Sequence, residues 1–252
     1  MKILVIGDIH GKTIWKEIVG SEQPDLTIFL GDYVTTHHKE TPEEQINNLM
    51  DILTWKEDEP DKVILLRGNQ DMQLLGYHWA KCSGYNMELG KLMEPIKTQF
   101  LNSTQWIFPY EIGKKFYVFS HAGISKTWYE NVKRSTKIEC MKDINNLEPS
   151  ELFGFTPNDF NDYSGTSITQ PCTWIRPQAL IEDMPDNINQ VVGHTPIINR
   201  CFNVSEKMFS KYGIIAPELW LCDALDNQSY LVINGKRLYS KILGGKEKIK
   251  KK

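Results

Sequence analysis

The stretch Lys2-Ile-Leu-Val-Ile-Gly-Asp-Ile-His-Gly11 joins a short apolar run to a polar motif that ends in glycine. The run predicts a buried strand over residues 2–7, and Asp8 and His10 follow where that strand ends. The first third of the chain continues in the same alternating manner, with helix 13–19, strand 25–30, helix 42–55 and strand 62–66. Strands that alternate with helices indicate an α/β fold whose sheet is buried on both faces.

The pattern is less regular after residue 70. The spacing of apolar residues predicts a helix over 87–101, and short apolar runs predict strands at 116–119, 190–192, 219–222 and 230–233. Residues 125–170 have little strand pattern, so we expect loops and short helices that form a variable cap or insertion. These features predict one domain over residues 1–243, followed by a lysine-rich flexible tail at 244–252.

Composition narrows the class of protein. The chain has 252 residues, 40% hydrophobic residues and a formal net charge of −3, which is typical of a globular protein and gives no strong field for nucleic acid. Its apolar runs are far shorter than the ~20 residues that span a bilayer, and the N-terminal residues lack a signal-peptide pattern. The five cysteines are widely spaced. We therefore expect a cytoplasmic protein with reduced thiols, and we leave nucleic-acid binding through the lysine tail as an open alternative.

Six polar residues share one position, beside a glycine where a predicted strand ends: Asp8, His10, Asp32, Asn69, His121 and His194. Because carboxyl ends of strands in an α/β sheet converge on one crevice, these side chains are expected to meet. Oxygen and imidazole donors without a thiolate suit Mn²⁺, Fe or Zn²⁺ at a two-metal site better than a structural zinc. A shared carboxylate would hold two ions ~3.5–4 Å apart, a spacing used for displacement at phosphorus.

The order of these motifs is specific. They read Gly7-Asp-Ile-His-Gly11, Gly31-Asp-Tyr-Val34, Leu66-Arg-Gly-Asn69, Ser120-His-Ala-Gly123 and Gly193-His-Thr-Pro196. As an ordered set over roughly residues 1–240, they resemble the motifs of calcineurin-like metallophosphoesterases. The resemblance is to the branch of serine/threonine protein phosphatases and their bacterial and phage relatives. It implies a β-sandwich core flanked by helices, with a dinuclear centre at the strand ends.

The resemblance also assigns roles to these residues. Asp8 and His10 would hold the first metal, Asp32 would bridge, and the second metal would be held by Asn69, His121 and His194. A metal-bridging hydroxide would attack phosphorus directly, without a covalent enzyme intermediate. The expected cofactors are two divalent ions, with Mn²⁺ as the first choice and Fe, Zn²⁺ or Ni²⁺ as alternatives.

Phosphate contacts can be assigned in the same way. Trp174-Ile-Arg-Pro177 resembles the family's Trp-x-Arg segment, whose arginine contacts phosphate. Arg176 is therefore the expected catalytic clamp, because a planar guanidinium can meet two phosphate oxygens; a surface salt bridge is the alternative. Asn69 and Arg67 are further substrate-binding predictions, and Arg67 ranks second to Arg176 because it lies before its loop. Asp223 is expected to support the ligands or a nearby loop.

Two motifs depart from the family pattern. Thr35 and Gln70 stand where the family has an Asp–His pair that protonates the leaving group, and Thr36 replaces a phosphate-contacting arginine. Gln70, a predicted catalytic residue, can donate a hydrogen bond but not a proton. We therefore expect a preference for leaving groups that need little acid catalysis. Three histidines are alternatives for the lost acid, although such residues are more often surface or packing residues: His37, His38 and His78.

The resulting first hypothesis is a dinuclear-metal-dependent phosphoester hydrolase of the phosphatase type. A phosphodiesterase or nucleotide pyrophosphohydrolase is one alternative, and a catalytically weak metal-binding scaffold is another. The phosphorylated substrate stays open among a phosphoprotein, a nucleotide and a nucleic-acid end. Several aromatic residues of the cap region could stack on a base or simply pack the cap: Trp128, Tyr129, Phe153, Phe155, Phe160 and Tyr163.

Overall fold

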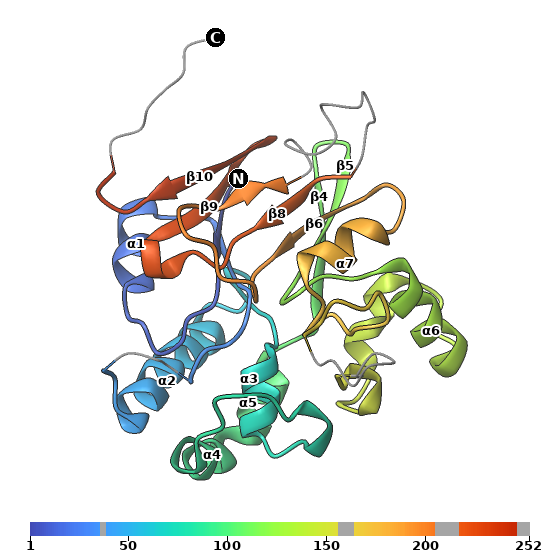
Figure 1. Ribbon diagram of the computed structural model, residues 1–252. Coiled ribbons are helices and arrows are strands. Elements are labelled where there is room, and N and C mark those ends of the chain that lie inside the picture. Colours follow the sequence, from blue (N-terminus) through green and yellow to red (C-terminus); the bar gives the residue numbers. More distant parts are fainter. Residues whose placement is uncertain (36–38, 156–163, 205–216, 246–252) are drawn as a thin grey trace.

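The computed structural model describes residues 1–35, 39–155, 164–204 and 217–245. Within these ranges, the chain forms two five-stranded mixed sheets with helices around them (Figure 1). This arrangement confirms the predicted α/β class with a sandwich core. Several predictions fall outside the described residues, namely those on Thr36, His37, His38, Phe160, Tyr163 and most of the lysine-rich tail.

Each sheet contains three parallel strands. The first has the order β10-β9-β1-β2-β3 and pairs β1, β2 and β3 in parallel. Its strands are β1 (Lys2–Ile6), β2 (Leu26–Phe29), β3 (Val63–Leu65), β9 (Ser229–Asn234) and β10 (Arg237–Ile242). The second has the order β4-β5-β6-β8-β7 and pairs β5, β6 and β8 in parallel. Its strands are β4 (Ile107–Ile112), β5 (Lys115–Ser120), β6 (Ile188–Val192), β7 (Phe202–Asn203) and β8 (Leu219–Leu221).

Alternate residues of β1 belong to two different cores. Ile3 and Val5 pack between the sheets, in a cluster that includes Phe119 from β5. Leu4 and Ile6 point the other way, into the cluster that the helices cover. These four side chains of β1 are buried. The strand is therefore covered on both faces, as its uninterrupted apolar run predicts.

The helices follow local sequence signals. Helix α2 (Pro42–Asp58) begins at Thr41, whose hydroxyl and Glu44 form a reciprocal capping box. The prediction of one helix over 87–101 is wrong. Pro95 lacks an N–H donor, and the segment divides into α4 (Met87–Met93), a 3₁₀ turn (Glu94–Ile96) and α5 (Lys97–Ser103). Two further helices at strand ends are α1 (Trp15–Glu22) and α3 (Asn69–Leu74).

The region predicted as a cap is built from short helices. It contains α6 (Lys126–Thr136) and two 3₁₀ helices, Met141–Asn146 and Glu151–Phe153, and the described part of 125–170 holds no strand. Helix α7 (Pro177–Glu182) follows and packs on β6 and β8 through Ala179 and Leu180. No helix in the described ranges is long and apolar enough to cross a membrane.

Candidate metal centre

The six predicted ligands come from the carboxyl ends of parallel strands in both sheets. Asp8 follows β1, Asp32 follows β2, Asn69 begins α3 after β3, His121 follows β5 and His194 follows β6. Among the described residues, two groups bring their potential ligand atoms within 4.8 Å of one another: Asp8, His10 and Asp32, and then Asp32, His121 and His194. Asp32 belongs to both groups. Asn69 adjoins the second, because its Oδ1 lies 2.9 Å from His121 Nε2.

Two glycines allow the ligand loops to approach each other. A Cβ added at Gly68 would overlap Asp32 Oδ1, and one added at Gly193 would overlap Asp8 Oδ1. A Cβ at Gly7 would overlap the carbonyl oxygen of Cys222, which lies just after β8. The strand ends of the two sheets therefore meet in backbone contact at the centre.

Each of the three imidazoles has one nitrogen on a main-chain carbonyl. These pairs are His10 Nδ1 with Val34 at 3.3 Å, His121 Nδ1 with Leu30 at 2.8 Å, and His194 Nε2 with Trp174 at 3.1 Å. Because a carbonyl oxygen only accepts, these contacts place the N–H on those nitrogens. The opposite nitrogen of each ring then carries a lone pair. A neutral imidazole of this kind can bind a metal through that nitrogen.

The opposite nitrogens of His121 and His10 face oxygen atoms. His121 Nε2 lies 2.9 Å from Asn69 Oδ1 and 3.5 Å from Asp32 Oδ2, and His10 Nε2 lies 3.8 Å from Asp8 Oδ2. Burial lowers the pKa of His121 to about 3, so this ring holds only one proton at neutral pH. The lone pairs of these ring nitrogens therefore face lone pairs of the oxygens, and a divalent cation between them would stabilise the arrangement. The donors present fit such an ion.

The carboxylates of the centre repel one another. Burial, followed by the charges of Asp223 and Asp32, raises the pKa of Asp8 well above its usual range. Burial and the charge of Asp71 do the same for the pKa of Asp32. Arg176 acts against both shifts through its positive charge, but it does not cancel them. The centre thus favours additional positive charge.

The sequence reasoning gave no role to Asp71. Its carboxylate accepts hydrogen bonds from the backbone N–H groups of Asp32, Tyr33 and Gly68, at 2.8–2.9 Å. It therefore fixes the loop after β2 against the loop after β3. The available signal was its place three residues after Gly68 at the start of a helix, where acidic residues accept from the capping N–H.

Arg176 lies beside the second ligand group. Its Nη1 donates to the carbonyl oxygen of His194 at 3.1 Å and to Thr195 Oγ1 at 3.2 Å, and its Nε donates to the carbonyl oxygen of Ser164 at 3.3 Å. Burial lowers its pKa, and the charges of Asp8 and other nearby carboxylates oppose this change. A guanidinium in this position can add charge-assisted hydrogen bonds to a phosphate.

Arg67 has a different environment. Its Nε and Nη2 donate to Thr104 and to the carbonyl oxygen of Leu101, at the C-terminal end of α5. Its guanidinium also stacks on Trp106, with 4.7 Å from Cζ to the ring centroid. These contacts support α5, and the substrate-binding role of Arg67 stays a prediction without a geometric basis.

Gln70 contacts the centre through its main chain. Its N–H donates to Asp32 Oδ1 at 2.9 Å, while its side chain bonds to the carbonyl oxygen of Ser83 and to Gln73, both at 3.1 Å. Thr35 is buried nearby at a φ of +71°, which is strained for a β-branched residue. Its hydroxyl has no hydrogen-bond partner among the described residues.

Other predicted residues lie outside the two ligand groups. His78 is 77% exposed, and its Nε2 lies 3.5 Å from Glu151 Oε1. Trp128 and Phe153 are buried and pack edge to face, so they form part of the core. Phe155 is half-buried and stacks on Trp174, whose carbonyl binds His194.

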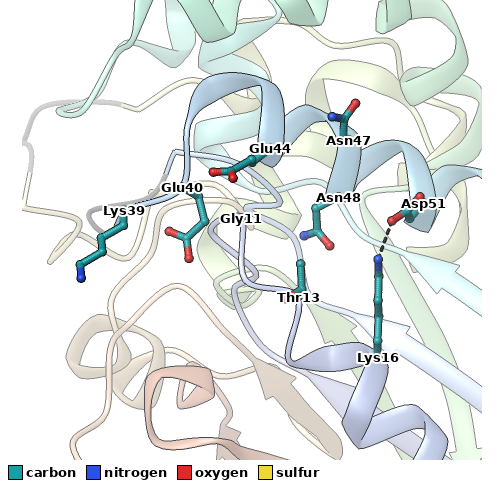
Figure 2. Close-up of a pocket in the computed structure, with 9 residues that line it drawn as sticks. All are labelled: Gly11, Thr13, Lys16, Lys39, Glu40, Glu44, Asn47, Asn48 and Asp51. Carbon is teal, nitrogen blue, oxygen red and sulfur yellow. Dashed lines mark hydrogen bonds and ion pairs between the residues drawn. The ribbon is translucent and has the colours of Figure 1, made fainter.

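A polar groove of about 510 Å³ begins beside the His10 loop and follows α2 (Figure 2). Its lining carries both signs of charge, and Lys16 is paired with Asp51 across it. The residues that line it are Gly11, Thr13, Lys16, Lys39, Glu40, Glu44, Asn47, Asn48 and Asp51. Such a mixed lining gives no general preference for anions or cations.

Comparison with known proteins agrees with this geometry. Residues 1–216 match the calcineurin-like phosphoesterase family, whereas no curated protein matches the sequence. Solved structures with the same fold include a cold-active protein-tyrosine phosphatase from a Shewanella species. It has a TM-score of 0.57 and 14% identity, and the match covers 96% of this chain and 77% of that chain.

Two further structures are similar. A protein serine/threonine phosphatase from Saccharomyces cerevisiae, with similarity to human PP5, has a TM-score of 0.55 and 13% identity over 99% of this chain and 82% of that chain. A metallophosphoesterase from Sphaerobacter thermophilus has a TM-score of 0.51 and 15% identity, and the match covers 95% of this chain and 86% of that chain. At these identities the structures establish the fold. The family match extends over most of the chain, and with it this protein belongs to the calcineurin-like phosphoesterase family of metal-dependent phosphoesterases.

Proposed function

We propose that the chain hydrolyses phosphoesters at a centre for two divalent cations. Asp8, His10 and Asp32 would hold one cation, and the other would be held by Asp32, Asn69, His121 and His194. The observation that carries the proposal is that potential ligand atoms converge in two groups that share Asp32, while each imidazole places one nitrogen on a main-chain carbonyl. When bound, the cations would acidify a water and neutralise charge on the phosphate.

The protein's own groups complete the site. Asp32 is shared by both ligand groups, and Asp71 holds its main chain in place. Arg176 is the proposed clamp on a phosphate oxygen, because its guanidinium is held beside His194 and its charge acts on Asp8 and Asp32. Asn69 contributes an amide oxygen whose orientation is set by the N–H···S contact from its Nδ2 to Cys82, at 3.5 Å.

Gln70 cannot donate a proton to the leaving group. The Gln70 amide has no acidic proton, and its side-chain contacts lead to Ser83 and Gln73. General acid catalysis is commonly worth ~10²–10⁴ in rate, so alkyl phosphates should suffer most from its loss. We therefore propose a phosphatase-type hydrolase that favours aryl esters or phosphoanhydrides. A phosphodiesterase or pyrophosphohydrolase is the second candidate, because Thr36 replaces an arginine that would select a monoester.

The test compares p-nitrophenyl phosphate with bis-p-nitrophenyl phosphate, each with Mn²⁺, Ni²⁺, Zn²⁺ or Mg²⁺. These leaving groups need little acid, so turnover should depend on the metal and should be lost in Asp32→Asn and His194→Ala. Asp51→Asn, an exposed carboxylate in the α2 groove, is the matched control and should retain activity. Turnover that survives both ligand substitutions would show that the proposed centre is not the active site.

The monoester and diester results separate the proposed substrate classes. Preference for the monoester supports the phosphatase assignment, and preference for the diester supports the phosphodiesterase alternative. If two metals bind and neither compound is hydrolysed, the chain is better described as a metal-binding scaffold. Mn²⁺ is the proposed native ion, and the same assay ranks it against Ni²⁺ and Zn²⁺.

A further inference from the structure

Four rings form a column from the cap region to the metal centre. Phe155 stacks on Trp174 with ring centroids 4.1 Å apart and an interplanar angle of 22°. Trp174 lies 5.1 Å from the His194 ring, and His194 lies 5.0 Å from the His121 ring. Phe155 and Trp174 therefore extend the row of rings outward from the proposed ligands His194 and His121.

Trp174 contacts His194 in a second way, through its main chain. Its carbonyl oxygen accepts the N–H of His194 Nε2 at 3.1 Å, so one residue contacts both the ring and the N–H of the ligand. Arg176 is part of the same arrangement. Its guanidinium carbon lies 5.6 Å from the Trp174 ring, and its Nη1 donates to the carbonyl oxygen of His194.

The main chain around Trp174 is held by Gly165. This glycine has a φ of +83°, and an added Cβ would lie 2.6 Å from the Trp174 carbonyl oxygen and 3.0 Å from Arg176 Cγ. The Gly165 carbonyl also accepts the N–H of Arg176 at 2.8 Å. The segment from Trp174 to Arg176 is thus fixed on its main-chain side, and its indole is held between Phe155 and His194.

We propose that Trp174 is a positioning residue that sets the orientations of His194 and Arg176 together, with Phe155 holding its indole from the cap side. The proposal rests on the proposed function, because it requires His194 to be a metal ligand. A neutral imidazole binds a cation through one lone pair, so a rotation of the ring misdirects that lone pair. Partners that orient a ligand commonly contribute 10–100-fold to metal affinity.

The first experiment measures metal binding rather than turnover. The full-length protein is freed of metal and titrated with Mn²⁺ by calorimetry, and His194→Ala identifies the binding event that depends on His194. Trp174→Leu keeps the main-chain carbonyl and removes the ring contact, so it should raise the dissociation constant of that event by about tenfold, the lower end of the range for a lost orienting partner. It should change the other event by less than about threefold. Trp174→Phe keeps an aromatic ring and should recover most of the affinity. A folded Trp174→Leu protein with wild-type affinity for both ions would overturn the proposal.

A double-mutant cycle tests whether Trp174 acts through His194. In the His194→Ala background, Trp174→Leu should cause no further loss of Mn²⁺ affinity, because the ligand that it orients is already absent. Losses that add would show that Trp174 acts elsewhere and would also overturn the proposal. If Trp174→Leu does not fold, Phe155→Leu takes its place in the cycle.

Phe153 provides a matched control within the cap region. It is fully buried and stacks on Trp106, away from the column. Phe155→Leu should weaken the His194-dependent event several-fold, whereas Phe153→Leu should lower the melting temperature and leave Mn²⁺ affinity unchanged. If both variants lose affinity in proportion to stability, the column has only a structural role. If the wild type binds no Mn²⁺ and hydrolyses neither phosphate, the proposed function itself fails.

Discussion

Glu22 and Asp8 are both buried carboxylates near β1, but their surroundings are opposite. Glu22 is 7% exposed and accepts hydrogen bonds from Lys2 Nζ at 2.6 Å, Tyr230 Oη at 2.6 Å and Lys241 Nζ at 3.0 Å. Burial alone would raise its pKa, but these partners lower the pKa to about 2. The chain itself thus compensates the charge of Glu22.

Asp8 is 2% exposed and has other carboxylates as its neighbours. Burial raises its pKa, and Asp223 and Asp32 raise it further. A hydrogen bond from the His194 N–H, at 2.9 Å, only partly offsets this effect. The comparison separates a buried charge that the fold compensates from one that the proposed metal centre leaves uncompensated. A carboxylate compensated by its own chain is structural, whereas one left in excess is prepared for a charge from outside.

The largest effect on activity is expected for the substitution Asp32→Asn. Removing the carboxylate shared by both ligand groups should lower metal-dependent turnover by more than ~100-fold, which exceeds the usual loss for a residue that only supports a ligand. In the metal-free protein the same change removes a buried charge, so the melting temperature should stay constant or rise. Activity assays and thermal unfolding in a chelator measure the two effects. A lower melting temperature without metal would contradict the comparison.

Gly193→Ala should be the next most severe change. Its Cβ would overlap Asp8 Oδ1, so either the Asp8 carboxylate or the loop that carries His194 must move. We expect loss of most Mn²⁺ affinity and activity. Gly20→Ala in α1 is the matched control, because a Cβ there meets no atom within 4 Å. Alanine in a helix should stabilise the protein by roughly 0.5–1 kcal/mol. Retained Mn²⁺ binding in Gly193→Ala would show that the approach of the two loops is not required.

Glu22→Gln should affect stability and not chemistry. A pKa lowered from 4.5 to about 2 corresponds to at most roughly 3 kcal/mol of stability at neutral pH. Because the folded-state pKa is depressed, this contribution is fully present above pH 4.5 and is lost as the pH falls through about 2. The difference in unfolding free energy between wild type and variant should therefore shrink over that range. A difference that stays constant on acidification would indicate lost packing rather than lost charge.

Asp51→Asn should have the smallest effect. Lys16 and Asp51 form an exposed ion pair, and their side chains are 45% and 55% accessible. Exposed pairs contribute ~0–1 kcal/mol, so chemical denaturation should show a change within that range. The same variant tests the α2 groove, since a raised KM for a bulky substrate alone would give the groove a role in binding.

The sequence signals were stronger for the strands that carry the proposed ligands than for the edge strands β4 and β10. Each proposed ligand follows a buried parallel strand, whose continuous apolar run is a strong signal. The edge strands β4 and β10 were not predicted. β4 contains Pro109, which weakens a strand pattern and is tolerated at an edge, and most β10 side chains are only half-buried.

Contacts between residues that are far apart in the sequence could not be predicted either. The tautomer of each histidine depends on carbonyl groups of Leu30, Val34 and Trp174, which are distant in sequence from the rings they bind. The same holds for Asp71, whose carboxylate joins two loops. Local sequence patterns contain no information on such pairings.

The backbone contact between Gly7 and Cys222 has a kinetic consequence. The first sheet supplies Asp8, Asp32 and Asn69, and the second supplies His121 and His194, so neither sheet can form the complete centre alone. An ion held by Asp32 and Asn69 from the first sheet and by His121 and His194 from the second would therefore act as a removable cross-link between the halves of the sandwich. If the halves dock after the folding transition state, metal should slow unfolding without accelerating folding. Chelation would then shorten the lifetime of the native protein, and proteolysis would report that lifetime.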